Sequence, residues 1–521
     1  MLEKLRKSDG VSGFLSINES IYDSYETGHA GTALSTAIGM AIARDLKKEN
    51  NEIIALVGDA SLANGLSLEA LNHLSDLNNK VIIIINDNQM SISQNFGGIN
   101  KLLNDIRLSH LYLEGKNILK GESKVKRFIY KNLKLVKDSL KRSIDKENWL
   151  ENLGFNYIGV VDGHNLEKLK EALEIAKNSK ESIIVHVSTI KGKGYKDAEE
   201  DKLGDYHGVG AKSTSKEKDK VSWSEVVSES LLTLASSNDS LCVITPAMVN
   251  GSKLANFFNK YPKRSFDVGI AEEHALTLAS GLALNGLLPF VSIYSTFLQR
   301  GYDMLSHDLA RMNSNVVIGV DRAGIIGQDG SSHQGIFDVA LALTLPNSRI
   351  AMPLIYSDIS KLLINEFNYR GVSFIRYPRE RITRDNKTYK IEVAKARTLN
   401  KKKNAMKAII GIGPLTNKLA DKIKELNLDI DVYGFIYIRP LDEKLLLNIA
   451  KQYTEIIIYD PYSIKTGLYS EILDFYNSNN IKIKLEFIGI PLEFLPHGEI
   501  DEILDKYKLS IDEVIKRLTG E

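Results

Sequence analysis

The stretch Gly58-Asp59-Ala60-Ser61-Leu62-Ala63-Asn64-Gly65 lies between two short apolar runs, residues 53–57 and 81–85, and the second run leads into Asn86-Asp87-Asn88. Runs this short and this apolar are typical of buried parallel strands. The leucines and alanines between them fit a helix that packs on the sheet. The pattern therefore predicts that Asp59 and Asn88 follow the carboxyl ends of neighbouring strands, the edge where open α/β sheets bind ligands.

Oxygen-bearing side chains at two strand ends suit a hard cation such as Mg²⁺, which needs few protein ligands when phosphate and water complete its shell. The glycines allow the backbone to come close to a diphosphate. A second interpretation is that Gly, Asp and Asn only form strand-end turns, where they are common. The separation of 29 positions between Asp59 and Asn88, with both at strand ends, favours the metal site.

The segments around Asp59 and Asn88 resemble the magnesium and thiamine diphosphate motif of transketolase-like enzymes, which is a Gly-Asp-Gly followed by Asn-Asn or Asn-Asp-Asn. Residues 28–30, 69–73 and 86–93 resemble more narrowly the 1-deoxy-D-xylulose-5-phosphate synthase family, and the likeness runs from about Gly10 to the C-terminus. The resemblance implies Mg²⁺ and thiamine diphosphate as cofactors. The implied metal ligands are Asp59, Asn88 and the main-chain carbonyl of Met90.

Glu272 begins a predicted helix whose other early residues are small or apolar. The residues alone favour a carboxylate that balances the helix dipole. The resemblance implies instead that Glu272 protonates the aminopyrimidine ring of the cofactor, which a poorly solvated carboxyl with a raised pKa can do. Phe297 would stack on the same ring. The full set of implied cofactor contacts is Gly28, His29, Ala30, Asp59, Ala60, Ser61, Asn88, Met90, Tyr195, Glu272 and Phe297.

A glycine-rich loop, residues 321–335, follows a predicted strand and carries Asp, Arg and His, a composition that favours function over structure. By resemblance, Arg322, Arg379 and Tyr294 would bind the phosphate of an aldose phosphate, because a guanidinium pairs well with phosphate oxygens. The implied substrate-binding residues are Tyr294, Arg300, Arg322, Asp329, His333 and Arg379. The implied catalytic residues are Glu272, His29, His207, His333 and Asp329; the three histidines are unranked as proton carriers, and His207 can equally be an ordinary loop residue.

Composition narrows the class of protein. The net charge is +1 with 26% charged residues, which disfavours a nucleic-acid or membrane-surface role. The single cysteine, Cys242, excludes an internal disulfide and fits a reducing cytosol. The first residues form no apolar signal and no run is long enough to span a bilayer. We expect a cytoplasmic enzyme.

The length of 521 residues exceeds what one core holds and predicts three domains. The expected fold is α/β, with three doubly wound domains in a transketolase-like order. The predicted boundaries are 1–210 for a shortened diphosphate-binding domain, 211–221 for a linker, 222–388 for a pyrimidine-binding domain and 389–521 for a C-terminal domain. The resemblance also implies a homodimer.

Two departures from the family pattern stand out. Members carry a further segment before the point that matches Gly10, with an Asp-Val-Gly-His-Gln word that has no counterpart here. Three explanations stay open: the segment is a separate polypeptide, the start is mis-assigned or deleted, or this copy is impaired. In addition, Ala60 stands where the family has glycine, and if that position needs positive φ the alanine costs on the order of 1 kcal/mol.

The resemblance implies a thiamine diphosphate-dependent condensation of pyruvate with D-glyceraldehyde 3-phosphate to 1-deoxy-D-xylulose 5-phosphate and CO₂, a precursor of isoprenoids, thiamine and pyridoxal. One alternative is another transketolase-like or 2-oxo-acid-using enzyme with the same cofactor. Another is an inactive or partial subunit that needs a separate N-terminal chain.

Overall fold

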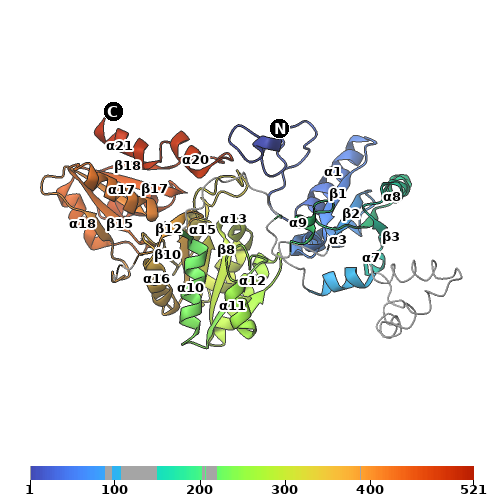
Figure 1. Ribbon diagram of the computed structural model, residues 1–521, viewed down its shortest axis with the longest axis horizontal. Coiled ribbons are helices and arrows are strands. Elements are labelled where there is room, and N and C mark those ends of the chain that lie inside the picture. Colours follow the sequence, from blue (N-terminus) through green and yellow to red (C-terminus); the bar gives the residue numbers. More distant parts are fainter. Residues whose placement is uncertain are drawn as a thin grey trace. The chain divides into compact units, whose positions relative to one another are not determined.

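The computed structural model describes residues 2–88, 97–106, 149–201, 206, 220–385, 387 and 389–520 (Figure 1). The chain divides into two compact units. The first-sheet unit comprises His29–Val209 and Gly269–Ala271, and the larger unit comprises Met1–Gly28, Gly210–Val268 and Glu272–Glu521. Met90 and His207, both predicted site residues, lie outside the described residues.

The first-sheet unit contains a four-stranded parallel sheet in the order β1-β2-β4-β3. β1 pairs with β2 so that Gly58 lies opposite Asn86. The apolar runs 53–57 and 81–85, which flank residues 58–65, are therefore adjacent parallel strands, as predicted. The elements of this unit are α1 (Ala33–Lys47), β1 (Ile54–Gly58), α2 (Asp59–Leu62), α3 (Gly65–Leu74), β2 (Ile82–Asp87), α7 (Trp149–Asn152), β3 (Asn156–Asp162), α8 (Leu166–Asn178), β4 (Ile183–Ser188) and α9 (Lys196–Glu199).

The two faces of this sheet are covered unequally. Helices α1 and α3 pack on one face against the buried side chains of Ala55 and Val57. On the other face α8 packs on β3 and β4. Ile54 and Leu56, which alternate with the buried residues of β1, are 54% and 66% exposed. Within the described part of the chain, the outer edge of β1 has no strand beside it.

The larger unit holds a seven-stranded sheet in the order β16-β10-β11-β9-β8-β6-β7, parallel except where β16 joins β10. The strands are β6 (Leu241–Thr245), β7 (Ser265–Asp267), β8 (Leu288–Tyr294), β9 (Val316–Asp321), β10 (Arg349–Ala351), β11 (Val372–Tyr377) and β16 (Tyr437–Arg439). The helices are α10 (Trp223–Ala235), α11 (Ala255–Lys260), α12 (Glu272–Leu284), α13 (Ser295–Leu298), α14 (Tyr302–Met304), α15 (Asp338–Leu343) and α16 (Asp358–Phe367), with short 3-10 helices at Leu2–Lys4, Pro262–Arg264 and Gln299–Gly301 and a π-helix at Leu305–Ala310.

A five-stranded sheet in the order β13-β15-β14-β17-β18 completes the larger unit, and a small ribbon pairs β5 with β12. Buried residues of both large sheets, such as Val291 and Ile410, belong to one hydrophobic core. This shared core explains why these two sheets form a single compact unit. The elements are β5 (Lys220–Ser222), β12 (Arg381–Thr383), β13 (Arg397–Asn400), β14 (Lys407–Ile412), α17 (Pro414–Glu425), β15 (Ile430–Phe435), α18 (Glu443–Gln452), β17 (Glu455–Ile464), α19 (Leu468–Ser478), β18 (Lys484–Ile490), α20 (Ile500–Lys506) and α21 (Ile511–Thr519).

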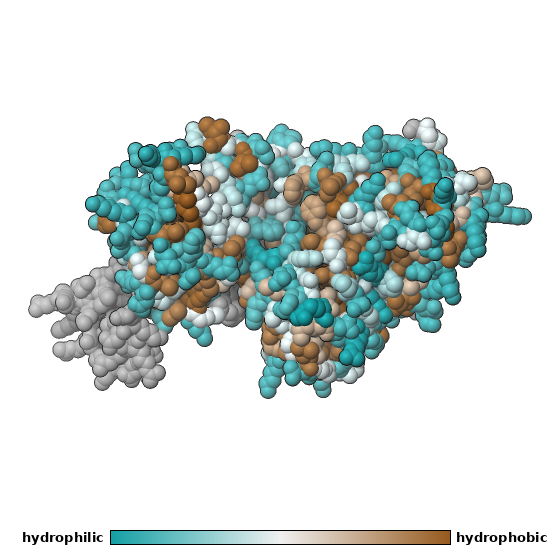
Figure 2. Space-filling view, turned by 180° about the vertical axis from the view of Figure 1, so that it is seen from behind, coloured by the Kyte–Doolittle hydropathy of each residue, from teal (hydrophilic) through white to brown (hydrophobic). Residues whose placement is uncertain are grey.

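The predicted fold class, α/β with largely parallel sheets, is confirmed by these topologies. On the face shown in Figure 2, hydrophilic and hydrophobic residues are interspersed. Among the residues that the structure describes, no helix combines the length and the apolar character needed to cross a bilayer.

Candidate active site

Asp59 and Asn88 lie at the same edge of the first sheet, because the parallel pairing of β1 and β2 ends both strands there. Asp59 is 4% exposed and is the first residue of α2; its Oδ1 accepts a hydrogen bond from the main-chain N–H of Ala60 at 2.9 Å. In the described ranges no three His, Cys, Asp or Glu residues are grouped to hold a metal ion. The side chains at the two strand ends offer a carboxylate oxygen and an amide oxygen, ligand types that suit Mg²⁺.

Ala60 lies inside α2 and is not among the residues with positive φ. The condition under which alanine would be strained at this position, a positive φ, is therefore not met, and helical backbone suits alanine better than glycine. The neighbouring Ser61 accepts a hydrogen bond at its main-chain oxygen from the Ser67 hydroxyl at 2.7 Å. The turn after β1 is thus a short helical segment tied to α3.

Helix α1 begins at Ala33, with Thr32 as its N-cap residue, so the preceding residues lie outside the helix. Gly31 has a φ of +93°, which helical backbone does not allow. A Cβ at this position would collide with the side chain of Asn64, the N-cap residue of α3. His29 and Ala30 therefore lie in a close-packed loop ahead of the helix.

Glu272 is the first residue of α12 and is 4% exposed. Burial raises the pKa of the Glu272 carboxyl above its usual value, although the neighbouring Arg300 opposes this shift. The Nη1 atom of Arg300 donates to Oε2 of Glu272 at 3.2 Å. Arg300, predicted to bind substrate, here contacts the predicted proton donor, and the carboxyl can retain a proton at a higher pH than an exposed glutamate.

Four aromatic side chains of the larger unit stack in sequence. The Phe297 ring is parallel to the Tyr294 ring at 5.6 Å, and its edge meets the His333 ring at 5.6 Å. The Phe14 ring is stacked on the His333 ring, with 4.5 Å between the ring centroids. The Ser332 hydroxyl lies 2.9 Å from Nδ1 of His333, so both the position and the tilt of this imidazole are fixed.

Three arginines lie in or next to the loop at residues 321–335. The Arg322 guanidinium lies 4.2 Å from the Tyr294 ring, and its buried Nε has no hydrogen-bond partner among the described residues. Asp329 accepts a hydrogen bond from Nη1 of Arg379 at 2.9 Å and a second one from Arg6. Burial alone would raise the pKa of Asp329, but Arg379 and Arg6 lower it below its usual value, so the carboxylate stays ionised.

Two charged residues that interact with predicted site residues, Arg6 and Lys191, were not predicted from the sequence. Arg6 lies in a charged lead that carries no motif, and its partner Asp329 is 323 positions away. Lys191 precedes Gly192 in the sequence, and the fold brings it close enough to Asp59 and Asp201 to interact with both charges. Burial lowers the pKa of Lys191, and the two aspartates oppose that shift.

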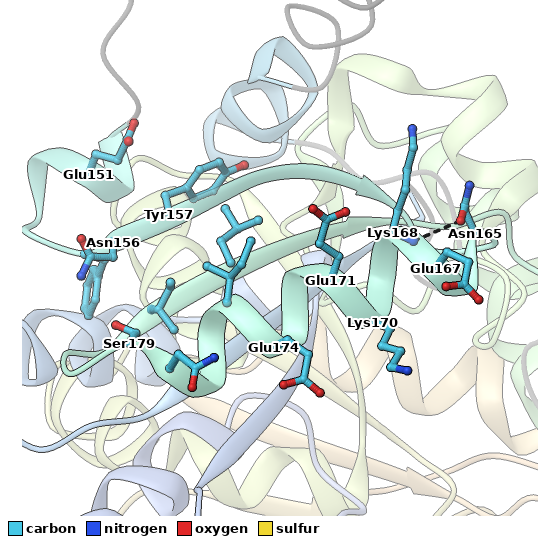
Figure 3. Close-up of a pocket in the computed structure, with 15 residues that line it drawn as sticks. Glu151, Asn156, Tyr157, Asn165, Glu167, Lys168, Lys170, Glu171, Glu174 and Ser179 are labelled. Atoms are coloured by element: carbon cyan, nitrogen blue, oxygen red, sulfur yellow. Dashed lines mark hydrogen bonds between the residues drawn. The ribbon is translucent and has the colours of Figure 1, made fainter.

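The remaining predicted residues lie in different surroundings. Tyr195 is largely exposed and its hydroxyl donates to Asp197 at 3.1 Å. Gly28 packs closely enough against Ser332 that a Cβ would collide with that side chain. An open groove between β3 and α8 (Figure 3) is lined by side chains such as Lys170, Glu171 and Glu174 and includes none of the predicted site residues.

Comparisons with known proteins cover almost the whole chain. A family model described as 1-deoxy-D-xylulose-5-phosphate synthase matches residues 1–189. The transketolase pyrimidine binding domain matches residues 219–384, and the transketolase C-terminal domain matches residues 395–514. Among curated relatives, the 1-deoxy-D-xylulose-5-phosphate synthase of Listeria welshimeri is 42% identical over 98% of this chain and 83% of its own length. That of Clostridium tetani is 38% identical over 99% of this chain and 85% of its own length.

Two solved structures resemble the fold. The transketolase from Campylobacter jejuni aligns with a TM-score of 0.50 at 16% identity, over 95% of this chain and 82% of that one. A structure titled "Split gene transketolase, inactive beta4 tetramer" aligns with a TM-score of 0.51 at 24% identity, over 58% of this chain and 97% of that one. At these identities the likeness concerns the fold alone.

Proposed function

Because this chain belongs to the 1-deoxy-D-xylulose-5-phosphate synthase family, we propose that it condenses pyruvate with D-glyceraldehyde 3-phosphate to give 1-deoxy-D-xylulose 5-phosphate and CO₂. The observation that carries the proposal is the match to relatives of that name along nearly the full chain. The grouping of Glu272, the aromatic stack and the arginines near the ends of β8 and β9 supports it.

The residues at the ends of β1 and β2 fit a metal-bound diphosphate. Asp59 and Asn88 provide a carboxylate and an amide oxygen at adjacent strand ends, and we assign them to Mg²⁺ together with the carbonyl of Met90. The turn at Ala60 and Ser61 would present main-chain groups to the diphosphate. Further contacts are assigned to Gly28, His29, Ala30 and Tyr195.

Glu272 and Phe297 are assigned to the other end of the cofactor. When bound, thiamine diphosphate supplies the carbanion chemistry that decarboxylates a 2-oxo acid and passes on the remaining two-carbon unit. The buried carboxyl of Glu272 would hold a proton for a ring nitrogen, since its surroundings disfavour the charged form. Phe297 would orient the ring by stacking. His29, His207 and His333 are assigned to proton transfer at the substrates.

Arg322, Arg379 and Tyr294 are assigned to the substrate phosphate. The buried Nε of Arg322 lacks a partner among the described residues, and a phosphate oxygen would supply one. Asp329 holds Arg379 at one oxygen and Arg6 at the other, which keeps the guanidinium groups oriented. The same ionised carboxylate, with His333, would contact a substrate hydroxyl or carbonyl group.

Replacing Arg379 with Ala is expected to raise KM for the phosphorylated substrate about 10- to 100-fold, because a charge-assisted hydrogen bond is lost. KM for pyruvate, which has no phosphate, should stay within about twofold of the wild-type value under the same principle. Steady-state kinetics with each substrate varied in turn measures both values. Arg381→Ala, at an exposed arginine two residues away, serves as the control. Equal increases in the two KM values would contradict the assignment.

The reaction itself is tested by product formation. We expect 1-deoxy-D-xylulose 5-phosphate and CO₂ from pyruvate plus D-glyceraldehyde 3-phosphate, with activity that depends on added Mg²⁺ and thiamine diphosphate. A ketose phosphate donor in place of pyruvate should give no transfer. Activity with the ketose donor alone would favour a transketolase, which is the alternative enzyme.

We also propose that the chain forms a homodimer, as the family resemblance implies. We propose that it acts in the cytoplasm, where its buried cysteine would stay reduced. The domain boundaries predicted from the sequence are kept as part of the proposal.

A further strand-bearing segment is proposed to cover the open edge of β1. Two observations support it: among the described residues no strand lies beside β1 at that edge, and Ile54 and Leu56 are exposed on one face of that strand. If this segment is a separate polypeptide, mixing it with the chain should increase activity, and activity of the chain by itself at family levels would argue against the need for it.

A further inference from the structure

Three polar side chains form a hydrogen-bonded chain across the first sheet, one from each of β3, β4 and β2. The Tyr157 hydroxyl lies 2.6 Å from Nδ1 of His186, and Nε2 of His186 lies 3.1 Å from Oδ2 of Asp87. His186 is fully buried and Asp87 is 3% exposed. The Tyr157 ring lies on the side of β3 away from α8 (Figure 3), among the side chains that α1 and α3 cover. We name these residues the tyrosine–histidine–aspartate chain.

The end of β2 is held on both faces of the sheet. Asn86 and Asp87 are consecutive in a strand, so their side chains point in opposite directions. The Thr189 hydroxyl donates to Oδ1 of Asn86 at 2.7 Å, while His186 contacts the Asp87 carboxylate. The main-chain N–H of Thr189 also donates to the Asp87 carbonyl at 3.0 Å. The next residue is Asn88, so the proposed metal ligand directly follows a strand end that is hydrogen-bonded on both faces of the sheet.

The tyrosine–histidine–aspartate chain lies in an otherwise aliphatic part of the sheet. The side chains of Ile83, Ile85 and Ile184 on the same face are aliphatic and buried. An aliphatic residue in place of His186 would pack there without needing any partner, whereas a buried imidazole, carboxylate and phenol are tolerated only when each satisfies the next. Such a network fixes side-chain orientation, and one end of it lies beside Asn88. Groups that orient metal ligands in this way usually matter for metal affinity.

We propose that the tyrosine–histidine–aspartate chain positions Asn88 for the Mg²⁺ that holds the cofactor diphosphate. His186 and Tyr157 are therefore positioning residues, since they act through Asp87 and the end of β2 and not by contact with substrate. The inference rests on the proposed function for the identity of the metal–cofactor complex. The fixed geometry of the strand end can be measured without any ligand.

The test compares His186→Phe and Tyr157→Phe with the wild-type full chain. Titration of Mg²⁺ into protein with thiamine diphosphate present, followed by calorimetry, should show an apparent Mg²⁺ affinity about 10-fold weaker in either variant. Amide hydrogen exchange without ligand should be faster in the peptide that ends at Asn88. His186→Gln, which keeps a donor for Asp87, should restore most of the affinity.

Ser182→Ala is the matched control. The Ser182 hydroxyl donates to the Asn79 carbonyl at 2.9 Å and accepts from the Val81 N–H at 3.1 Å, at the opposite end of the same strands. This variant should lower thermal stability without changing Mg²⁺ affinity or exchange at Asn88.

Wild-type Mg²⁺ affinity together with wild-type exchange in both Phe variants would overturn the inference. If His186→Phe does not fold, Tyr157→Phe, which removes a single hydroxyl, decides the matter. Failure of the wild type to bind thiamine diphosphate with Mg²⁺ would instead refute the proposed function, and the exchange comparison would still judge whether this chain fixes the strand end.

Discussion

Glu272→Gln lowers kcat about 100- to 10,000-fold, the range expected for loss of a general acid–base group, while the protein stays folded and binds its cofactor. The substituted amide would retain the size of the side chain and can accept the hydrogen bond from Arg300, but it cannot give up a proton. The measurement combines steady-state kinetics with calorimetric binding of thiamine diphosphate. Glu273→Gln, on the next residue of α12, is the control and should keep kcat within about twofold.

The pH dependence of stability separates this effect from unfolding. Folding raises the pKa of Glu272 above its ordinary value of 4.5. The stability that this carboxyl contributes is therefore complete below that value and is lost as the pH rises through the folded-state pKa. At about pH 8 the Gln variant, which has no charge to bury, should unfold at the same temperature as the wild type or at a higher one. Lower stability under these conditions together with lost activity would point to a structural role for Glu272.

Asp59→Asn weakens Mg²⁺-dependent binding of thiamine diphosphate by at least about 100-fold, since the only proposed carboxylate ligand is replaced by a neutral amide and even outer-shell changes cost about 10- to 100-fold. Activity at limiting cofactor should fall by the same factor and recover in part at high Mg²⁺. Calorimetry at several Mg²⁺ concentrations measures the affinity.

Asp76→Asn provides the comparison for this variant. Asp76 follows α3 in an exposed turn of the same unit, so its replacement removes the same charge from the chain without touching the strand ends. Its Mg²⁺ dependence should match the wild type. If Asp59→Asn also matched the wild type, the metal would have to be held elsewhere.

The strand-end residues could be predicted from the sequence because the signal is local. A short apolar run followed by Asp59 or Asn88 indicates both the strand and where it stops, and parallel pairing then brings the two ends together. The position of Glu272 at a helix start is local in the same way. Its burial is not, because that depends on side chains from other elements.

Other features depend on contacts that no local pattern encodes. The ion pairs of Arg6 and Arg379 with Asp329 join three distant parts of the chain. The backbone conformation at Ala60 could not be predicted from the glycine of the family pattern, and the structure shows that the residue is helical. At Gly31 the structure does have a positive φ, and α1 begins only after this residue, at Ala33.

The open edge of β1 also bears on colloidal behaviour. Natural edge strands usually carry a lysine, a proline or a bulge that discourages pairing with other molecules. β1 reads Ile-Ala-Leu-Val-Gly and has none of these gatekeepers. Without a cover on that edge, concentrated preparations of the chain would tend to associate strand to strand and precipitate. We therefore expect a partner that pairs with the five residues of β1 to raise the solubility of the chain.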